Sequence, residues 1–129
     1  MSYSSEILRG NTETIILAIL KNKDSYGYEI MKNIIDRGKG LIDIKDATIY
    51  TALKRMEKEG VIATYWGDDD GGPRRKYYAI TQRGREVYAQ KAAEWREVNI
   101  VLNSLIEGNR QADHTGTATD VKKGDKDGN

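Results

Sequence analysis

The 129-residue chain contains no cysteine, one proline and one histidine, His114. The absence of cysteine excludes disulfides, thiol catalysis and thiolate metal sites, and a lone histidine excludes zinc sites built on histidine. No apolar run approaches the roughly 20 residues that span a bilayer, and the N-terminus lacks the basic and apolar regions of a signal peptide. We therefore expect a cytoplasmic protein without a membrane segment.

The composition is that of one domain with a small core. Hydrophobic residues make up 38% of the chain and charged residues 32%. So lean a core predicts that part of the chain is unstructured or that a partner subunit completes the apolar surface. The net charge is +1. It is unevenly distributed, because residues 45–85 hold nine bases and six acids, an excess of three positive charges that weakly indicates a polyanionic partner.

Apolar residues recur at three- and four-residue steps in three N-terminal segments, which predicts three helices. The predicted helices span residues 5–22, 26–37 and 46–60. Residues suited to N-caps stand at their starts: Ser4 or Ser5, Asp24 or Ser25, and Asp46. Gly38 and Gly60 would end the second and third helices.

Two strands and a long helix are expected next. Residues 61–66 and 75–80 are rich in β-branched and aromatic side chains, and the glycine- and proline-containing turn between them predicts a β-hairpin. Thr81 would cap a final helix that runs to about Glu107, roughly 35 to 40 Å long at 1.5 Å per residue. A domain this small does not cover such a helix, which favours a dimer; the alternative is an amphipathic helix folded back on its own domain.

Helix, helix, helix and hairpin is the order of elements in a winged helix-turn-helix. The predicted fold class is therefore α+β, mostly α, a winged helix-turn-helix with a long C-terminal dimerisation helix. We divide the chain into a DNA-binding domain (1–80), a dimerisation helix (81–107) and a disordered tail (108–129) that includes His114.

The third predicted helix has the two faces of a DNA-reading helix. Its apolar stripe is Ile49, Ala52, Leu53 and Met56, which we expect to point inward. Small groups, hydroxyls and bases occupy the face opposite this stripe and its flanks, where Lys54 and Arg55 suit phosphates or guanine edges and Thr48 or Thr51 suits a base or a phosphate. The alternative is that these bases only solvate an amphipathic helix.

The segments "SYGYEI", "TIYTALKRMEKEG" and "RRKYYAIT", followed by a long helix with Trp95, resemble the PadR family of transcriptional regulators over residues 5–107. The short C-terminal region is similar to the smaller PadR subfamily, and most of all to its multidrug-sensing members. The resemblance implies a homodimeric repressor that binds a palindromic operator in double-stranded DNA and is released by a small molecule or another signal. Tyr50 would hydrogen-bond a phosphate. The candidate DNA contacts are Lys45, Thr48, Tyr50, Thr51, Lys54, Arg55, Arg74, Arg75 and Lys76.

In the multidrug-sensing relatives, a tryptophan of the last helix pairs with its mate across the dimer axis and flanks an apolar pore. Trp95 matches that tryptophan, which implies a planar aromatic effector stacked between two indoles. Trp95 as a plain interface anchor is the alternative. Asn99 stands where the relatives carry an acid, which weakens attraction for cationic drugs; Glu13 would restore some of it and Lys91 opposes it. The candidate pore residues are Ile7, Gly10, Glu13, Thr14, Tyr88, Lys91, Ala92, Trp95, Val98 and Asn99.

Other functions are less well supported by the residues. The chain has no nucleophile beside a base and no paired carboxylates for a pocket, so we expect no enzyme and no cofactor. Asp68 to Asp70 lack metal-binding spacing, and we expect no metal. Our hypothesis for these three acids is that they face away from DNA or pair with the neighbouring bases, which lowers non-specific affinity. The alternative function is a winged-helix docking module that does not bind DNA, which would lack the steep salt dependence of phosphate contacts.

Overall fold

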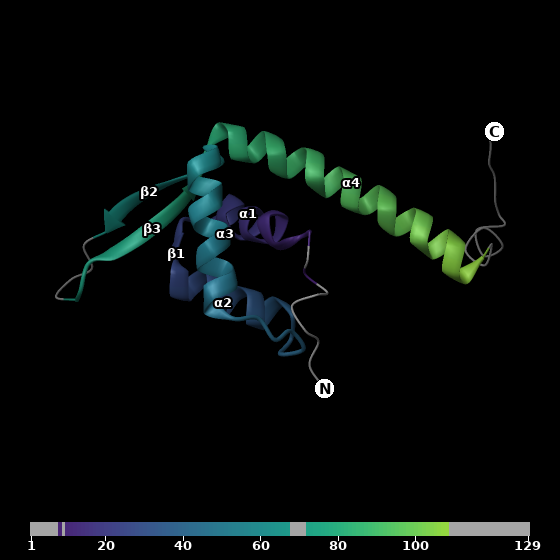
Figure 1. Cartoon of the computed structure of the whole chain (residues 1–129), viewed down its shortest axis with the longest axis horizontal. Helices are drawn as coiled ribbons and strands as arrows, with labels where there is room; N and C mark the ends of the chain where they lie inside the picture. The colour runs from purple at the N-terminus through teal and green to yellow at the C-terminus, as the bar shows by residue number, and fades with distance from the viewer. Residues whose placement is uncertain (1–7, 9, 68–71, 109–129) are drawn as a thin grey trace. The chain divides into compact units, whose positions relative to one another are not determined.

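The computed structural model describes residues 8, 10–67 and 72–108 of the chain. The fold class is α+β and mostly helical, as predicted, with four helices and three strands in the described part (Figure 1). The elements are α1 (Thr12–Asn22), β1 (Ser25–Tyr26), α2 (Gly27–Arg37), α3 (Asp46–Glu59), β2 (Ile62–Gly67), β3 (Arg75–Ile80) and α4 (Gln82–Glu107). None of the described helices is long and apolar enough to cross a membrane.

The chain divides into two compact units, residues 1–92 and 93–129. The first unit holds α1 to α3, the sheet and the beginning of α4. The described part of the second unit is the remainder of α4, up to the glycine that follows it.

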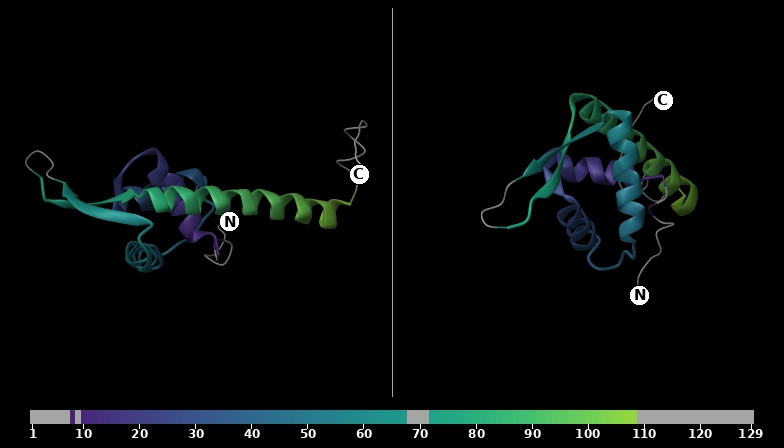
Figure 2. Two further views of the ribbon diagram at one scale, coloured as in Figure 1. Left: turned by 90° about the horizontal axis from the view of Figure 1, so that it is seen from above. Right: turned by 60° about the vertical axis from the view of Figure 1, so that its left-hand side comes forward.

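The core of the first unit lies between α1, α2, α3 and the sheet (Figure 2). Its largest fully buried side chains are Ile16, Leu17, Leu20, Ile30, Ile49, Leu53, Met56 and Ile62. The whole apolar stripe predicted for the third helix is buried, which confirms the inward face of α3. Because this stripe is buried, the opposite face of α3 is exposed to solvent.

The hairpin is confirmed, but it belongs to a larger sheet than the sequence predicts. Three antiparallel strands are arranged in the order β1-β3-β2. β1 was expected as the start of a helix, because two residues are too few to show an alternating pattern. It exists through its pairing with β3, where Tyr26 lies opposite Tyr77 and Tyr77 lies opposite Tyr65. A row of three tyrosines therefore crosses the sheet.

The first helix begins later than predicted. Gly10 has a φ of 84°, in the left-handed region that a right-handed helix does not use, and α1 starts at Thr12. The proposed caps Ser4 and Ser5 lie outside the described residues.

The caps proposed for the next two helices were also misplaced. The N-cap of α2 is Tyr26, not Asp24 or Ser25. The buried Ser25 hydroxyl instead donates to the carbonyl of Lys23 at 3.1 Å. α3 is capped by Lys45, and Asp46 is its first helical residue.

The boundaries of the remaining elements were predicted closely. Gly60 ends α3 with a φ of 79°, a left-handed C-cap that glycine adopts readily. α4 begins just after Thr81 and ends at Glu107. The acids Asp68 to Asp70, the predicted disordered tail beyond Gly108, and His114 within it lie outside the described residues.

Candidate nucleic-acid interface

The exposed surface of α3 carries hydroxyls in its first half and bases in its second half, together with three acids, Asp46, Glu57 and Glu59. Since the core holds the helix by one stripe, the other side chains project into solvent. The exposed predicted contacts on or beside α3 are Lys45, Thr48, Tyr50, Thr51, Lys54 and Arg55. An exposed helix with small residues, hydroxyls and bases has the chemistry to enter a major groove and to contact phosphates.

Tyr50 occupies the side of α3 that faces α2, and its position depends on a glycine. A Cβ atom built on Gly27 would lie 2.1 Å from the Tyr50 hydroxyl oxygen and 2.6 Å from the ring carbon that bears it. Only glycine at the first position of α2 lets the ring pass so close. The same two residues line a pocket of about 400 Å³ between α2 and α3, with Met31, Ile35 and Ile49 among its walls. The Tyr50 hydroxyl is thereby held beside the N-terminus of α2.

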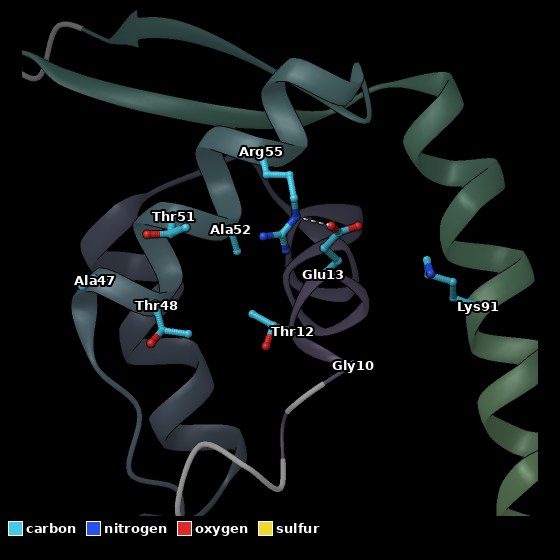
Figure 3. Close-up of a pocket in the computed structure, with 9 residues that line it drawn as sticks. All are labelled: Gly10, Thr12, Glu13, Ala47, Thr48, Thr51, Ala52, Arg55 and Lys91. Atoms are coloured by element: carbon cyan, nitrogen blue, oxygen red, sulfur yellow. Dashed lines mark hydrogen bonds and ion pairs between the residues drawn. The ribbon is translucent and has the colours of Figure 1, made fainter.

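The opposite flank of α3 borders a larger pocket of about 590 Å³ (Figure 3). It is lined by Gly10, Thr12, Glu13, Ala47, Thr48, Thr51, Ala52, Arg55 and Lys91. Arg55 reaches across to α1, where its Nε donates to Glu13 Oε2 at 2.8 Å. This contact joins a predicted DNA-binding residue to a predicted pore residue.

The bases of the hairpin are held by aromatic rings and by one acid of α3. The Arg74 guanidinium carbon lies 5.5 Å from the centre of the Trp66 ring, and that of Arg75 lies 4.5 Å from the centre of the Tyr26 ring. Lys76 Nζ lies 3.7 Å from Glu57 Oε1. These cation–π and ion-pair contacts orient the three bases in the free protein.

Glu57 also binds the neighbouring strand, which sequence reasoning missed. The Thr64 hydroxyl donates to Glu57 Oε2 at 3.0 Å, so one carboxylate of α3 contacts both β2 and β3. The residues come from separate elements and no local spacing relates them. Only the tertiary fold brings them together.

On the outer face of the sheet, Tyr65 donates its hydroxyl to Asp24 Oδ2 at 2.8 Å. This hydrogen bond is the main cause that raises the pKa of Tyr65 above its ordinary value, with smaller contributions from desolvation and from the charge of Asp24. The Tyr65 and Tyr77 rings stack at 5.5 Å, and Tyr26 meets Tyr77 edge-on at 5.6 Å. Burial raises the pKa of Tyr78 on the inner face. Because both pKa values are raised, Tyr65 and Tyr78 stay neutral near pH 7 and act through hydrogen bonds and packing.

The end of α3 is joined to the start of α4. The Thr81 hydroxyl donates to the carbonyl of Gly60 at 2.8 Å and accepts the N–H of Gly84 at 3.0 Å. Arg83 Nε donates to the carbonyl of Glu59 at 3.2 Å. A Cβ on Gly84 would lie 2.1 Å from the carbonyl oxygen of Val61, so glycine is needed for this close approach.

The candidate pore residues fall into three groups. Ile7 lies outside the described residues. Gly10, Glu13, Thr14, Tyr88, Lys91 and Ala92 belong to the first unit, where Lys21 Nζ lies 4.9 Å from the centre of the Tyr88 ring. Trp95, Val98 and Asn99 belong to the second unit, in which Trp95 is 53% and Val98 54% exposed.

Comparison with known proteins agrees with this arrangement. The family model of the transcriptional regulator PadR-like family matches residues 16–90. The structure of a transcriptional regulator from Clostridium thermocellum is similar with a TM-score of 0.73 and 44% identity, covering 81% of this chain and 98% of that one. A PadR family transcription regulator from Clostridium difficile has a TM-score of 0.67 and 39% identity, covering 74% and 97%.

A curated relative is longer than this chain. The transcriptional regulator YqjI of Escherichia coli is 29% identical over 109 residues, which are 84% of this chain and 47% of that protein. The chain thus spans about half the length of this relative.

Proposed function

The chain belongs to the PadR-like family of transcriptional regulators, which are DNA-binding proteins and not enzymes. We propose that it is a cytoplasmic repressor that binds a palindromic operator as a homodimer. The DNA-binding domain is residues 1–80, and residues 81–107 form the dimerisation helix. The observation that carries the proposal is the set of exposed hydroxyls and bases on α3, together with the bases of the hairpin, whose sheet packs against the same helix.

The proposed contacts to DNA come from α3 and from the wing, which is the β2–β3 hairpin. They are Lys45, Thr48, Tyr50, Thr51, Lys54, Arg74, Arg75 and Lys76. Lys54 and the wing bases would neutralise phosphates, and the threonines would hydrogen-bond base edges or phosphates. Arg55 is left out of this set because its Nε–H is donated to Glu13 Oε2.

The salt dependence of DNA binding tests this function. With duplexes from the region upstream of the gene and a random-sequence duplex, log K should fall linearly with log salt concentration. Lys54→Gln should weaken binding to both and flatten the slope by about 0.9, the value for one phosphate contact. Lys32→Gln is the matched control, because Lys32 lies on α2 in an ion pair with Asp36 and outside the proposed surface. An unchanged slope for Lys54→Gln would remove this residue from the interface, and salt-independent binding of the wild type would favour the docking module.

The effector site is proposed at the dimer axis, around Trp95. The indole of Trp95 is 53% exposed, and its flat apolar face supports a planar aromatic ligand. Planar dyes should quench the tryptophan fluorescence of the wild type more than that of Trp95→Ala, in which only Trp66 remains. Equal quenching of the two proteins would leave Trp95 as an interface anchor alone.

A further inference from the structure

Arg55 and Glu13 form an ion pair that unites two regions of the protein. They are 42 residues apart in the sequence, on α3 and α1. The Nε–Oε2 distance of 2.8 Å is that of a charge-assisted hydrogen bond. The Glu13 side chain is only 21% exposed, whereas that of Arg55 is 48% exposed. The acid is therefore the more enclosed partner of the pair.

The direction of the Arg55 side chain separates it from the other polar groups of α3. In Figure 3 it runs from α3 toward Glu13 on α1, whereas Thr51 points away from that contact. Lys91 lies in the same pocket on the far side of Glu13. The Arg55 side chain thus reaches from α3 toward α1.

Glu13 competes with DNA phosphate for Arg55 in this geometry. The hydrogen bond from Arg55 Nε to Glu13 Oε2 draws the guanidinium from α3 toward α1, so it would have to break for Arg55 to turn to a phosphate. A charge-assisted hydrogen bond of this length is roughly twice as strong as one between neutral groups. The guanidinium should therefore remain with Glu13 when DNA is bound.

We propose that Glu13 is a positioning residue that keeps Arg55 out of the set of cations that bind phosphate, and so lowers the affinity of the protein for DNA of any sequence. This inference rests on the proposed DNA-binding function. A cation that stays paired with a carboxylate releases no counterion from the duplex. It therefore adds nothing to the slope of log K against log salt concentration. Glu13 thus sets how many phosphates α3 neutralises.

Three variants test the proposal on the random-sequence duplex, with affinity measured by fluorescence anisotropy from about 50 to 200 mM salt. Glu13→Gln should steepen the log–log slope by about 0.9 and tighten binding roughly three- to tenfold at the lower salt concentration, because one more cation reaches phosphate. Arg55→Gln should keep the wild-type slope. The double variant, Glu13→Gln with Arg55→Gln, should also keep the wild-type slope, because it has no arginine at position 55 that could turn to a phosphate.

Glu59→Gln is the matched control. It removes the same charge, also from the first unit, but the carboxylate of Glu59 has no ion pair among the described residues. Equal slopes for Glu13→Gln and Glu59→Gln would overturn the proposal, because net charge alone would then explain the effect. A slope flattened by about 0.9 in Arg55→Gln would also overturn it, since Arg55 would already bind phosphate in the wild type.

The outcomes separate this inference from the proposed function. A wild type that binds no duplex contradicts the function itself, whereas a binding wild type with unchanged variants contradicts only the role of Glu13. Thermal unfolding of each variant checks that it is folded. If Glu13→Gln does not fold, Arg55→Gln decides, because the proposal requires its slope to equal that of the wild type.

Discussion

At the scale of single residues, the position of Tyr50 depends on the absence of a side chain at Gly27. The ring carbon that bears the hydroxyl would lie 2.6 Å from an added Cβ, well inside van der Waals contact. The tyrosine cannot stay in place if that Cβ is present. Because Tyr50 is also a proposed phosphate contact, packing and DNA binding are linked at this point.

Gly27→Ala should therefore lower DNA affinity more than stability. Tyr50 is 49% exposed, so its ring can turn away from the added Cβ at little cost. We expect weaker binding to the duplex as Tyr50 moves, with little change in the free energy of unfolding measured in urea.

The Tyr50→Ala background provides the control. Without the ring there is no overlap, so the same Gly27→Ala change should leave the remaining DNA affinity unchanged. An equal loss of affinity in both backgrounds would show that the glycine is needed for a reason other than Tyr50.

The sequence predicts which side chains of one helix share a face, but it does not predict contacts between side chains of different elements. Ile49, Ala52, Leu53 and Met56 are buried as expected, because a helical period alone determines which side chains share a face. Glu57 and Asp24 gave no such signal. Their partners, Thr64, Lys76 and Tyr65, come from other elements, and only the packed sheet brings these residues within hydrogen-bond or ion-pair distance.

At the scale of elements, Thr81 connects two helices through one hydroxyl. It accepts the N–H of Gly84 in the first turn of α4 and donates to the carbonyl of Gly60, which ends α3. Both groups are among those that helix ends leave without a partner inside the helix. The hydroxyl therefore stabilises the start of one helix and the end of the other.

Removal of this hydroxyl should lower the stability of the protein. For Thr81→Ala we expect a loss of about 1 kcal/mol in the free energy of unfolding, the usual cost of losing a threonine N-cap. Thr81→Ser keeps the hydroxyl and should retain most of the stability. The measurement is chemical denaturation of the three proteins; a Thr81→Ala variant as stable as the wild type would show that water replaces both hydrogen bonds.

Element boundaries were predictable where one residue type determines them. Gly60 ends α3 and Thr81 precedes α4 as expected, because a left-handed C-cap and a hydroxyl N-cap have clear residue preferences. The start of α1 was not predictable in this way. The apolar pattern continues N-terminal to Thr12, but the left-handed backbone at Gly10 stops the helix there.

At the scale of the whole molecule, the second part of α4 leaves an apolar face uncovered. Leu102, Leu105 and Ile106 are 46%, 76% and 76% exposed, and Trp95 and Val98 lie on the same side at steps of three and four residues. These steps are those of a helix–helix seam. None of these side chains belongs to the hydrophobic core of the first unit, and a second copy of α4 is the proposed cover.

A charge within this seam should separate the subunits. Leu102→Glu places a carboxylate in the middle of the apolar face, where its burial without a partner costs several kcal/mol per ion. We expect monomers by light scattering at concentrations where the wild type is dimeric. Ile100→Glu is the matched control, because Ile100 is also exposed, at 67%, but lies about 160° around the helix from Leu102. It should leave the dimer intact.

The same pair of variants shows whether assembly is needed for operator binding. A palindromic site offers two half-sites, and a dimer that occupies both gains effective concentration that a monomer lacks. Leu102→Glu should therefore lose affinity for the upstream duplex by about 100-fold or more, and retain weak binding to random DNA. If Ile100→Glu dissociates as readily as Leu102→Glu, the seam is not the dimer interface; if Leu102→Glu remains a dimer, another surface of the chain holds the subunits together.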